Sequence, residues 1–278
     1  MFRILEKQRL ADNLVKLVIE APRASRSAQA GQFAIIKISE KGERVPLTIA
    51  DRDAAKGSVT IIAQEVGATT RYLGSLKAGD SIEHFLAPLG HPSEIENFGT
   101  CCVIGGGVGI AEILPQVRAL KEAGNKVITI IGARTQKLLI LESELRALSS
   151  ELYVMTDDGS YGEKGFVTQK MEEIIKREPV NRIFAVGPVP MMAAVVKATK
   201  PHNIKTIVSL NPIMLDATGM CGVCRVVVGG KVKFACVDGP EFDGHEVDFQ
   251  DLTNRLSTYI QEESSAKEHV CKVLGVKM

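Results

Sequence analysis

The first hundred residues alternate between short apolar runs and turn residues. Runs with strand character cover 14–20, 32–39, 58–64 and 81–86, and glycine or proline separates them. Several short strands at this spacing are typical of a small antiparallel barrel or sandwich. We therefore predict an antiparallel β-barrel over residues 1–97.

The pattern changes after residue 98. An apolar strand at 100–104 leads into a glycine-rich loop at 105–109, and a helical period follows as far as Gly124. Further apolar strands at 126–131, 152–156 and 182–186 alternate with helical stretches at 142–149, 168–177 and 190–199. Strands alternating with helices predict a doubly wound parallel sheet of at least four strands over residues 98–208.

The remaining residues, 209–278, predict a small C-terminal module. They hold three cysteines, a glycine turn at Gly229-Gly230 between valine-rich segments, and a polar helix from about Asp248. The expected fold is therefore a multi-domain β plus α/β protein.

Composition and charge exclude several function classes. Thirty-four Lys and Arg stand against thirty-three Asp and Glu, so a net charge of +1 gives no reason to expect nucleic acid or an anionic membrane as partner. The longest uncharged stretch, 97–111, has fifteen residues of which five are glycine, and a membrane span needs about 20 apolar residues. The N-terminus lacks the apolar core of a secretory signal, so we expect a cytoplasmic protein.

Half of the six cysteines fall within residues 221–236, in the pattern Asp216-x4-Cys221-x2-Cys224-x11-Cys236. Two thiolates two residues apart can bind one metal centre, and a third arriving from a hairpin completes most of a tetrahedral shell. In a reducing compartment such spacing indicates a metal site before it indicates a disulfide. We expect Cys101 and Cys102 to be core residues and assign no role to Cys271.

The spacing leaves the identity of the metal open. Zinc would use the three cysteines and His245 as a structural Cys₃His site. A [2Fe–2S] cluster would use Asp216 as an oxygen ligand in place of a fourth cysteine. A third alternative is that the thiols are free.

Three loops after strands predict a dinucleotide site. Gly105, Gly106, Gly107, Val108 and Gly109 lie between a strand and a helix, where backbone amides can approach a pyrophosphate. Later strand ends add Asp157, Asp158, Gly159, Ser160, Gly187, Pro188 and Met191. The carboxyl ends of parallel strands share one edge of the sheet, so we expect these loops to gather there. The alternative is that the glycines serve only a tight turn.

Two further features concern cofactor contacts. Arg134 follows the second strand of the sheet, where it would touch the adenosine ribose or accept a 2′-phosphate, unless it is a surface arginine. Thr48, on an expected barrel strand, can hydrogen-bond a flavin ring, and Gly67, Thr69 and Thr70 at a helix start can hold a diphosphate. The alternative is that Thr48 is an ordinary strand threonine and that the threonines at the helix start only cap the helix.

Taken in order, these motifs resemble the ferredoxin–NADP reductase superfamily, and the C-terminal cysteines resemble the branch with the electron-transfer subunits of dihydroorotate dehydrogenase. The match is closer to the small subunits of the electron-bifurcating, NADH-dependent reduced ferredoxin:NADP oxidoreductases, also labelled sulfide dehydrogenases. The most specific stretches are 209–214, 219–226 and 234–242. The dihydroorotate branch uses four cysteines, and this chain has three and an aspartate.

The resemblance implies FAD, NAD(H) and a [2Fe–2S] cluster as cofactors. FAD would contact Arg44, Pro46, Leu47, Thr48, Ile62, Ala63, Gln64, Gly67, Thr69 and Thr70, with Thr48 as the catalytic residue that tunes flavin N5. NAD(H) would bind the three loops of the sheet. The cluster would be held by Asp216, Cys221, Cys224 and Cys236.

The resemblance also implies a partner. This would be a larger subunit with flavin and [4Fe–4S] clusters, forming a heterodimer and communicating with ferredoxin. Competing interpretations are the electron-transfer subunit of a dihydroorotate dehydrogenase, a sulfur reductase, or a non-catalytic nucleotide-binding module with structural zinc.

Overall fold

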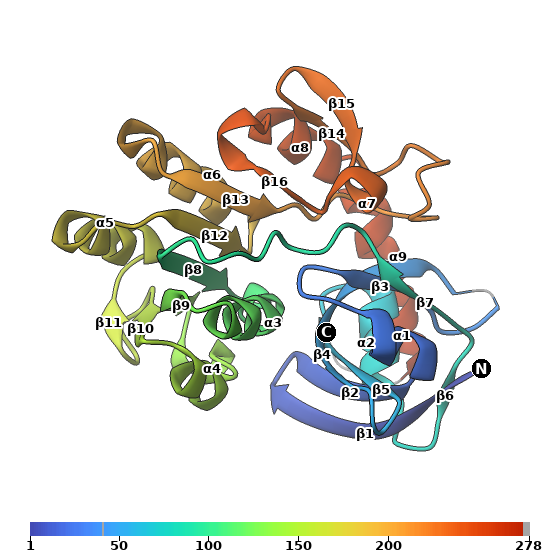
Figure 1. The fold of residues 1–278 in the computed structure, drawn as a ribbon. Helices are drawn as coiled ribbons and strands as arrows, with labels where there is room; N and C mark the ends of the chain where they lie inside the picture. The colour runs from blue at the N-terminus through green and yellow to red at the C-terminus, as the bar shows by residue number, and fades with distance from the viewer. Residues whose placement is uncertain (41, 275–278) are drawn as a thin grey trace.

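The computed structural model describes residues 1–40 and 42–274, without the side chains of residues 267 and 270–274. Three parts follow one another along the chain: a β-barrel, a mainly parallel sheet covered by helices, and a smaller C-terminal part built onto the edge of that sheet (Figure 1). The predicted fold class is confirmed. The domain limits themselves stay predictions.

The barrel is an antiparallel sheet in the strand order β6-β1-β2-β5-β4-β3-β7. Its strands are β1 (Phe2–Ala11), β2 (Leu14–Glu20), β3 (Phe33–Lys37), β4 (Arg44–Asp53), β5 (Ser58–Gln64), β6 (Ser81–Ile82) and β7 (His84–Leu89). Two short helices complete it, α1 (Pro22–Ser27) and α2 (Ala68–Ser75). Alternate residues of β2, such as Leu17 and Ile19, are fully buried in its core, as the period of a half-buried strand requires.

The second sheet has the order β11-β10-β9-β8-β12-β13-β16, and all its pairs are parallel except β13 with β16. Its strands are β8 (Thr100–Gly106), β9 (Lys126–Ala133), β10 (Glu151–Thr156), β11 (Glu163–Lys164), β12 (Arg182–Val186), β13 (Lys205–Ser209) and β16 (Glu241–Asp243). The helices are α3 (Gly109–Glu122), α4 (Glu142–Leu148), α5 (Val167–Arg177) and α6 (Val189–Thr199), with 3₁₀ turns η1 (Gln136–Leu138) and η2 (Lys200–His202).

Both faces of this sheet are buried. Cys101 and Val103 of β8 lie in the core under α3 and α4, whereas Cys102 and Ile104 lie in the core under α5 and α6. A strand buried on both faces is apolar throughout, which is why β8 is a continuous hydrophobic run. Burial raises the pKa of the Cys102 thiol to about 12, so this residue is an inert core thiol, as predicted for both neighbouring cysteines.

The C-terminal part contributes one strand to the sheet. After β13 the chain forms the hairpin β14 (Arg225–Val228) and β15 (Lys231–Phe234), then α7 (Ala235–Asp238), and β16 returns to extend the sheet antiparallel to β13. A 3₁₀ turn, η3 (Gly244–Glu246), leads to α8 (Phe249–Leu256) and α9 (Ile260–Leu274). The single predicted C-terminal helix is therefore two helices. The second one reaches back to pack on α2 of the barrel (Figure 1).

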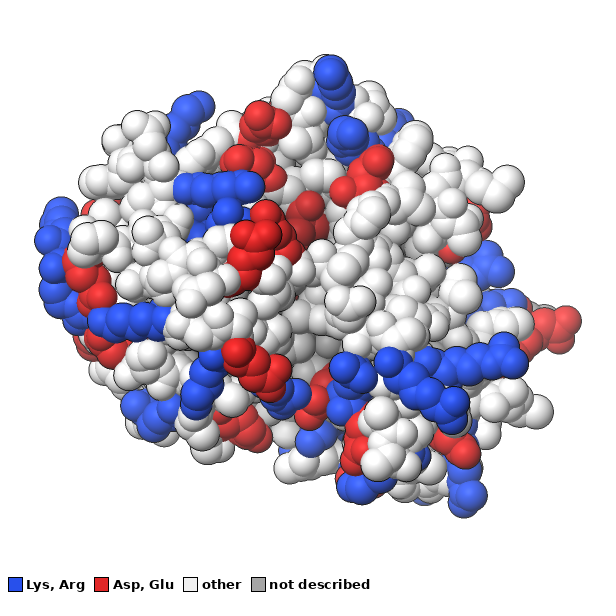
Figure 2. All heavy atoms as spheres, in the orientation of Figure 1, with Lys and Arg blue, Asp and Glu red and all other residues white. Residues whose placement is uncertain are grey.

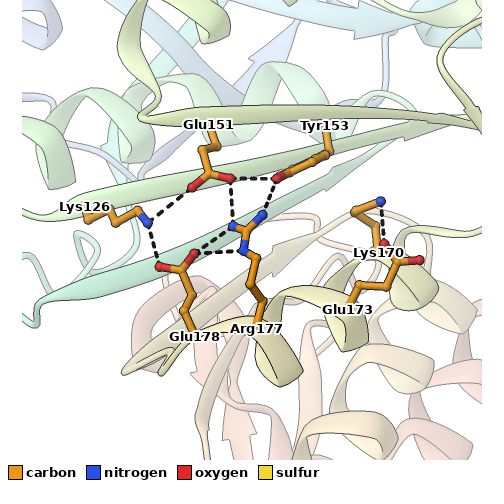
Figure 3. A network of polar contacts seen from close by, with 7 residues as sticks. All are labelled: Lys126, Glu151, Tyr153, Lys170, Glu173, Arg177 and Glu178. Atoms are coloured by element: carbon orange, nitrogen blue, oxygen red, sulfur yellow. Dashed lines mark hydrogen bonds and ion pairs between the residues drawn. The ribbon is translucent and has the colours of Figure 1, made fainter.

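A network of charged side chains connects the first residues of β9 and β10 with the last turn of α5 (Figure 3). Arg177 contacts Glu151 at 2.7 Å and Glu178 at 2.7 Å, and Lys126 contacts the same two carboxylates at 3.2 and 2.6 Å. The Tyr153 hydroxyl donates to Glu151 at 2.6 Å. This network lies at the edge opposite the glycine loop, so its role is stability. No helix in the described parts of the chain is both long and apolar enough to span a bilayer.

The network predicts an acid-sensitive contribution to stability. Hydrogen bonds from Tyr153, and then from Arg177 and Lys126, lower the pKa of Glu151 from 4.5 to about 2. A carboxyl whose folded-state pKa is depressed stabilises the protein above its unfolded pKa, and loses that contribution as the pH falls from about 4.5 towards 2. Solvent screening reduces the effect to about 1 kcal/mol. We expect Glu151→Gln to lower the thermal midpoint at pH 7 by about 2–4 °C.

The matched control is Glu172→Gln, which removes an exposed carboxylate of α5 outside the network. Thermal unfolding followed by circular dichroism should show no shift for this variant. The difference in thermal midpoint between wild type and Glu151→Gln should shrink as the pH approaches about 3. A difference that is independent of pH would contradict the ionic origin of the contribution.

Candidate functional site

The glycine loop lies where β8 passes into α3. A Cβ on Gly109 would approach the Val186 carbonyl oxygen to 2.3 Å, so this glycine is required by the close packing of α3 on the end of β12. Close packing therefore accounts for Gly109. Gly107 differs, because it has a left-handed backbone with φ +58° and open space beside its Cα, and its amide donates to the Gly132 carbonyl at 2.9 Å.

The structure brings the other two predicted loops to the same edge of the sheet. Gly187 and Met191 follow β12 and pack against Gly106. In the loop after β10, the backbone amide of Ser160 donates to Asp158 at 2.9 Å, and the Ser160 hydroxyl accepts from the Gln136 amide at 2.8 Å. Hydrogen bonds from Ser160 lower the pKa of Asp158.

Arg134 projects from the loop after β9 with an exposed side chain. Its carbonyl oxygen accepts from the Asp158 amide at 3.3 Å, which places the predicted ribose-contacting arginine beside the loop after β10. The cation is free to meet a ligand at this edge.

In the barrel, Pro46, Leu47 and Thr48 lie on β4, paired with β3. β4 packs against α3 of the other sheet, and Thr48 lies beside Glu112 in the first turn of that helix, where it opposes the rise in the Glu112 pKa that burial causes. Ala63 is fully buried in the barrel, so only its backbone could contact a cofactor. Ile62 is also buried, in the core that reaches α3, and Gln64 is half-buried.

The start of α2 has the properties of an anion site. The Gly67 amide donates to the Thr70 hydroxyl at 3.1 Å, and the Thr69 hydroxyl donates to the Glu43 carboxylate at 2.7 Å. A carboxylate thus already lies at a helix N-terminus, where negative charge is favoured. Arg71, one turn further, has a buried Nε without a hydrogen-bond partner. The helix start and Arg71 fit a diphosphate, which would take the place of the Glu43 carboxylate beside Thr69.

Arg71 was missed by the sequence analysis. Its position in the first turn after Gly67 was the available signal. The predicted Arg44 instead forms an ion pair with Asp216 at 3.6 Å. This pair joins the start of β4 to the loop that carries the cysteines, so the expected flavin and cluster sites are neighbours.

The structure brings together two of the four proposed cluster ligands. The Cys224 and Cys236 sulfurs, both buried, lie 3.1 Å apart, while Cys221 is exposed. Across the described ranges 1–40 and 42–274, no three His, Cys, Asp or Glu side chains gather closely enough to hold a metal ion. Burial, with the neighbouring Cys224 thiol, raises the pKa of Cys236 to about 12.

Two buried thiols at this distance fit a thiophilic centre. Sulfurs bound to one tetrahedral metal at about 2.3 Å lie about 3.8 Å apart, which a small rotation of either side chain would achieve. Gly219 and Gly222 have φ of +79° and +68°, and these turns curl the backbone around Cys221. The donor set therefore fits a cluster or zinc.

His245 lies elsewhere. Its Nε2 is 3.0 Å from the Thr199 hydroxyl, which in turn accepts from Thr206 at 2.7 Å. This position, between η3 and α6, is part of a hydroxyl network on the sheet edge. A Cys₃His zinc site is therefore not what the structure assembles.

Two family models match parts of the chain. Residues 103–197 match the oxidoreductase NAD-binding domain, and residues 211–248 match the iron–sulfur cluster binding domain of dihydroorotate dehydrogenase B. The chain is 46% identical, over 98% of its length and 96% of the relative's, to a dihydroorotate dehydrogenase B (NAD(+)) electron transfer subunit homolog of Thermotoga maritima. The chain belongs to the family of dihydroorotate dehydrogenase B electron-transfer subunits and their homologues.

Two further members of the family are informative. The electron transfer subunit of Bacillus velezensis dihydroorotate dehydrogenase B is 34% identical over 86% of this chain and 94% of that protein. A solved structure of the NADH-dependent reduced ferredoxin-NADP oxidoreductase, studied for flavin-based electron bifurcation, is 45% identical with a TM-score of 0.92 over 97% of both chains.

Family membership confirms the predicted resemblance and the oxidoreductase class. It also confirms FAD, NAD(H) and an iron–sulfur cluster of the [2Fe–2S] type as the cofactors. The chain is a subunit of a multi-subunit oxidoreductase. The residue assignments stay predictions.

The position of His245 gives a direct test of the ligand set. We expect Cys236→Ser to lose bound iron, because it removes a buried thiol, and His245→Ala to retain the full iron content. Iron and acid-labile sulfide analysis of anaerobically purified variants measures both. Loss of iron in His245→Ala at unchanged folding would restore histidine as a ligand.

Proposed function

We propose that the chain is the NAD(H)-side electron-transfer subunit of an electron-bifurcating, NADH-dependent ferredoxin:NADP oxidoreductase. The main support is the 45% identity and TM-score of 0.92 over 97% of both chains to such an enzyme. The bound cofactors would supply hydride transfer between nicotinamide C4 and flavin N5, and single-electron transfer at the cluster.

The chain's own residues position these reactions. The loops at Gly105–Gly109, Asp157–Ser160 and Gly187-Pro188 would hold the dinucleotide, and Arg134 would face its ribose. The backbone around Gly67, Thr69 and Thr70 would bind the flavin diphosphate, together with Arg71. Thr48 would donate a hydrogen bond to the flavin nitrogen that exchanges hydride.

The ion pair between Asp216 and Arg44 matters for the proposed role of the aspartate. Its carboxylate pairs with Arg44 at 3.6 Å, so a positive charge lies beside the proposed oxygen ligand. An oxygen ligand and a neighbouring cation change the charge around an iron–sulfur centre, and therefore its potential. The pair also connects the flavin strand β4 with the cluster loop.

Asp216 is testable by spectroscopy. We expect Asp216→Ala to change the g-values of the reduced cluster in electron paramagnetic resonance, and Asp216→Cys to restore a cluster with shifted g-values. Asp238→Ala is the control, since this aspartate lies near Cys236 but caps α7 through the Phe234 amide at 2.7 Å. An unchanged spectrum in Asp216→Ala would remove the aspartate from the ligand set.

Three exposed apolar residues, together called the apolar ring below, adjoin proposed ligands in the chain. Leu215, Met220 and Val237 are 47, 87 and 39% exposed, and each is the immediate neighbour of a proposed ligand. Figure 2 shows charged side chains of both signs over all three parts of the molecule, with an uncharged area near the middle of this face. We assign the ring to the docking of the larger flavin and [4Fe–4S] subunit, because electrons would leave the chain there.

The ring predicts a loss of assembly without a loss of cofactors. Met220→Asp should weaken co-purification with the larger subunit about tenfold or more, since it buries a charge in the contact. Val232→Asp is the control, because Val232 is 59% exposed on the β14–β15 hairpin and does not adjoin a proposed ligand in the chain. Equal effects of both variants would argue against the ring.

The identity of the co-purifying subunit separates the competing functions. A flavin and [4Fe–4S] subunit supports the bifurcating enzyme, whereas a dihydroorotate-oxidising subunit would overturn it in favour of the subunit named in the Thermotoga relative. Anaerobically purified chain should show a flavin band that NADH bleaches. A colourless protein with zinc would contradict the redox function.

A further inference from the structure

A cavity lies between the loop that carries the cysteines and helix α8. Its volume is about 160 Å³, several times the roughly 30 Å³ that one water molecule occupies. α8 packs against β14, the strand that follows Cys224 directly (Figure 1). The cavity is therefore in contact with the segment that holds two of the proposed cluster ligands.

Two arginines line this cavity and also contact the cysteine loop. Arg225, the first residue of β14, donates to the Gly222 carbonyl at 3.3 Å, and Arg255 of α8 donates through Nη2 to the Val223 carbonyl at 3.1 Å. The two carbonyls belong to the two residues that separate the paired cysteines. Two positive charges therefore lie against the backbone between two proposed ligands.

The lining of the cavity leaves these charges without a counter-ion. Among the described residues that line it, none is acidic, and both arginines donate to neutral carbonyls. The Nε of Arg255 is buried, and no described residue accepts a hydrogen bond from it. A buried donor without an acceptor is unfavourable, and the Nε–Nη2 edge of a guanidinium matches the two oxygens of an oxyanion. These properties indicate an oxyanion as the ligand of the cavity.

The apolar part of the lining decides which oxyanion fits. Five lining side chains are apolar: Pro212, Ile213, Val223, Leu252 and Leu256. Phosphate would place oxygens against them, whereas a carboxylate directs its oxygens to one side and its hydrocarbon to the other. At roughly 30 Å³ for each water-sized group, the cavity holds about five non-hydrogen atoms, the size of propionate.

We propose that this cavity binds a small carboxylate, and that the bound carboxylate makes the cluster harder to reduce. The effect on the cluster rests on the proposed function. Reduction adds negative charge to a cluster, which the two arginines favour, and a bound anion offsets their charge. The carboxylate is either a free acid or an acidic side chain of the larger subunit, because the end of a glutamate side chain has the chemistry of propionate.

Isothermal titration calorimetry of the purified chain with propionate, acetate and inorganic phosphate tests the site. Propionate should bind about fourfold more tightly than acetate, because it buries one more CH₂ group, and phosphate should bind more weakly than either. The same titration of the complete complex separates the two sources. Retained propionate binding identifies a free acid, and its loss identifies a side chain of the larger subunit.

Variants of the two arginines locate the binding. Arg255→Lys keeps the charge but removes the planar fork, so it should weaken propionate binding to the chain about tenfold or more. Arg225 is exposed, so Arg225→Gln should also weaken binding at unchanged folding. Lys231→Gln is the matched control, because it removes an exposed cation at the opposite end of the same hairpin. Wild-type chain that does not bind propionate, or variants of both arginines that bind it as wild type does, would overturn the site.

A redox titration of the cluster, followed by electron paramagnetic resonance, is independent of turnover. In the preparation that binds propionate, saturating propionate should lower the midpoint potential, and a tenfold preference for the oxidised form corresponds to about 59 mV. Lys231→Gln should show the same shift, and Arg255→Lys should lose it. A midpoint that propionate leaves unchanged would overturn the effect on the cluster. Protein without a reducible cluster would contradict the proposed function instead, and calorimetry would still decide the binding site.

Discussion

The contact between α3 and β4 is the constraint on which the rest of the arrangement depends. Hydride transfer requires two cofactors, held by two different domains, to meet at a fixed distance, and an error of about 1 Å is costly. The glycine loop is continuous with α3, and Thr48 lies on β4. The ion pair of Asp51 with Arg118 joins the helix to the strand. Because the ion pair is partly exposed, it adds little to the free energy of unfolding. Its main effect is to hold α3 in position against β4.

The C-terminal part depends on the same frame. β16 pairs with β13, so the segment that carries the cysteines is anchored to the nucleotide-binding sheet. Its loop is also joined to the barrel through Arg44 and Asp216. Each of the three parts therefore contacts both others. Glu241 belongs to this frame too, since it comes directly after Pro240 and contacts Gln116 of α3.

Much of the fold was predictable because its signals are local. The limits predicted for β5 and β12 coincide with the structure, since turn residues bound each apolar run. Other elements were missed for physical reasons. β1 is an exposed strand rich in charged residues, so its alternation is weak. The run at 81–86 is divided between β6 and β7, because each pairs with a different strand.

By itself the sequence predicted a cysteine metal site and nucleotide-binding loops, and its resemblance to a family named the cofactors. Three patterns predicted these sites: the spacing of the cysteines, the glycine loop between a strand and a helix, and the threonines at a helix start. Each pattern is a property of a short segment, so it can be recognised before the fold is known. Tertiary structure alone decided which polar groups meet. Gln116 and Glu241 are separated by 125 residues, and no local pattern relates them. They meet because helix and strand bury their apolar faces in one core, and burial then requires the polar groups left inside to find each other.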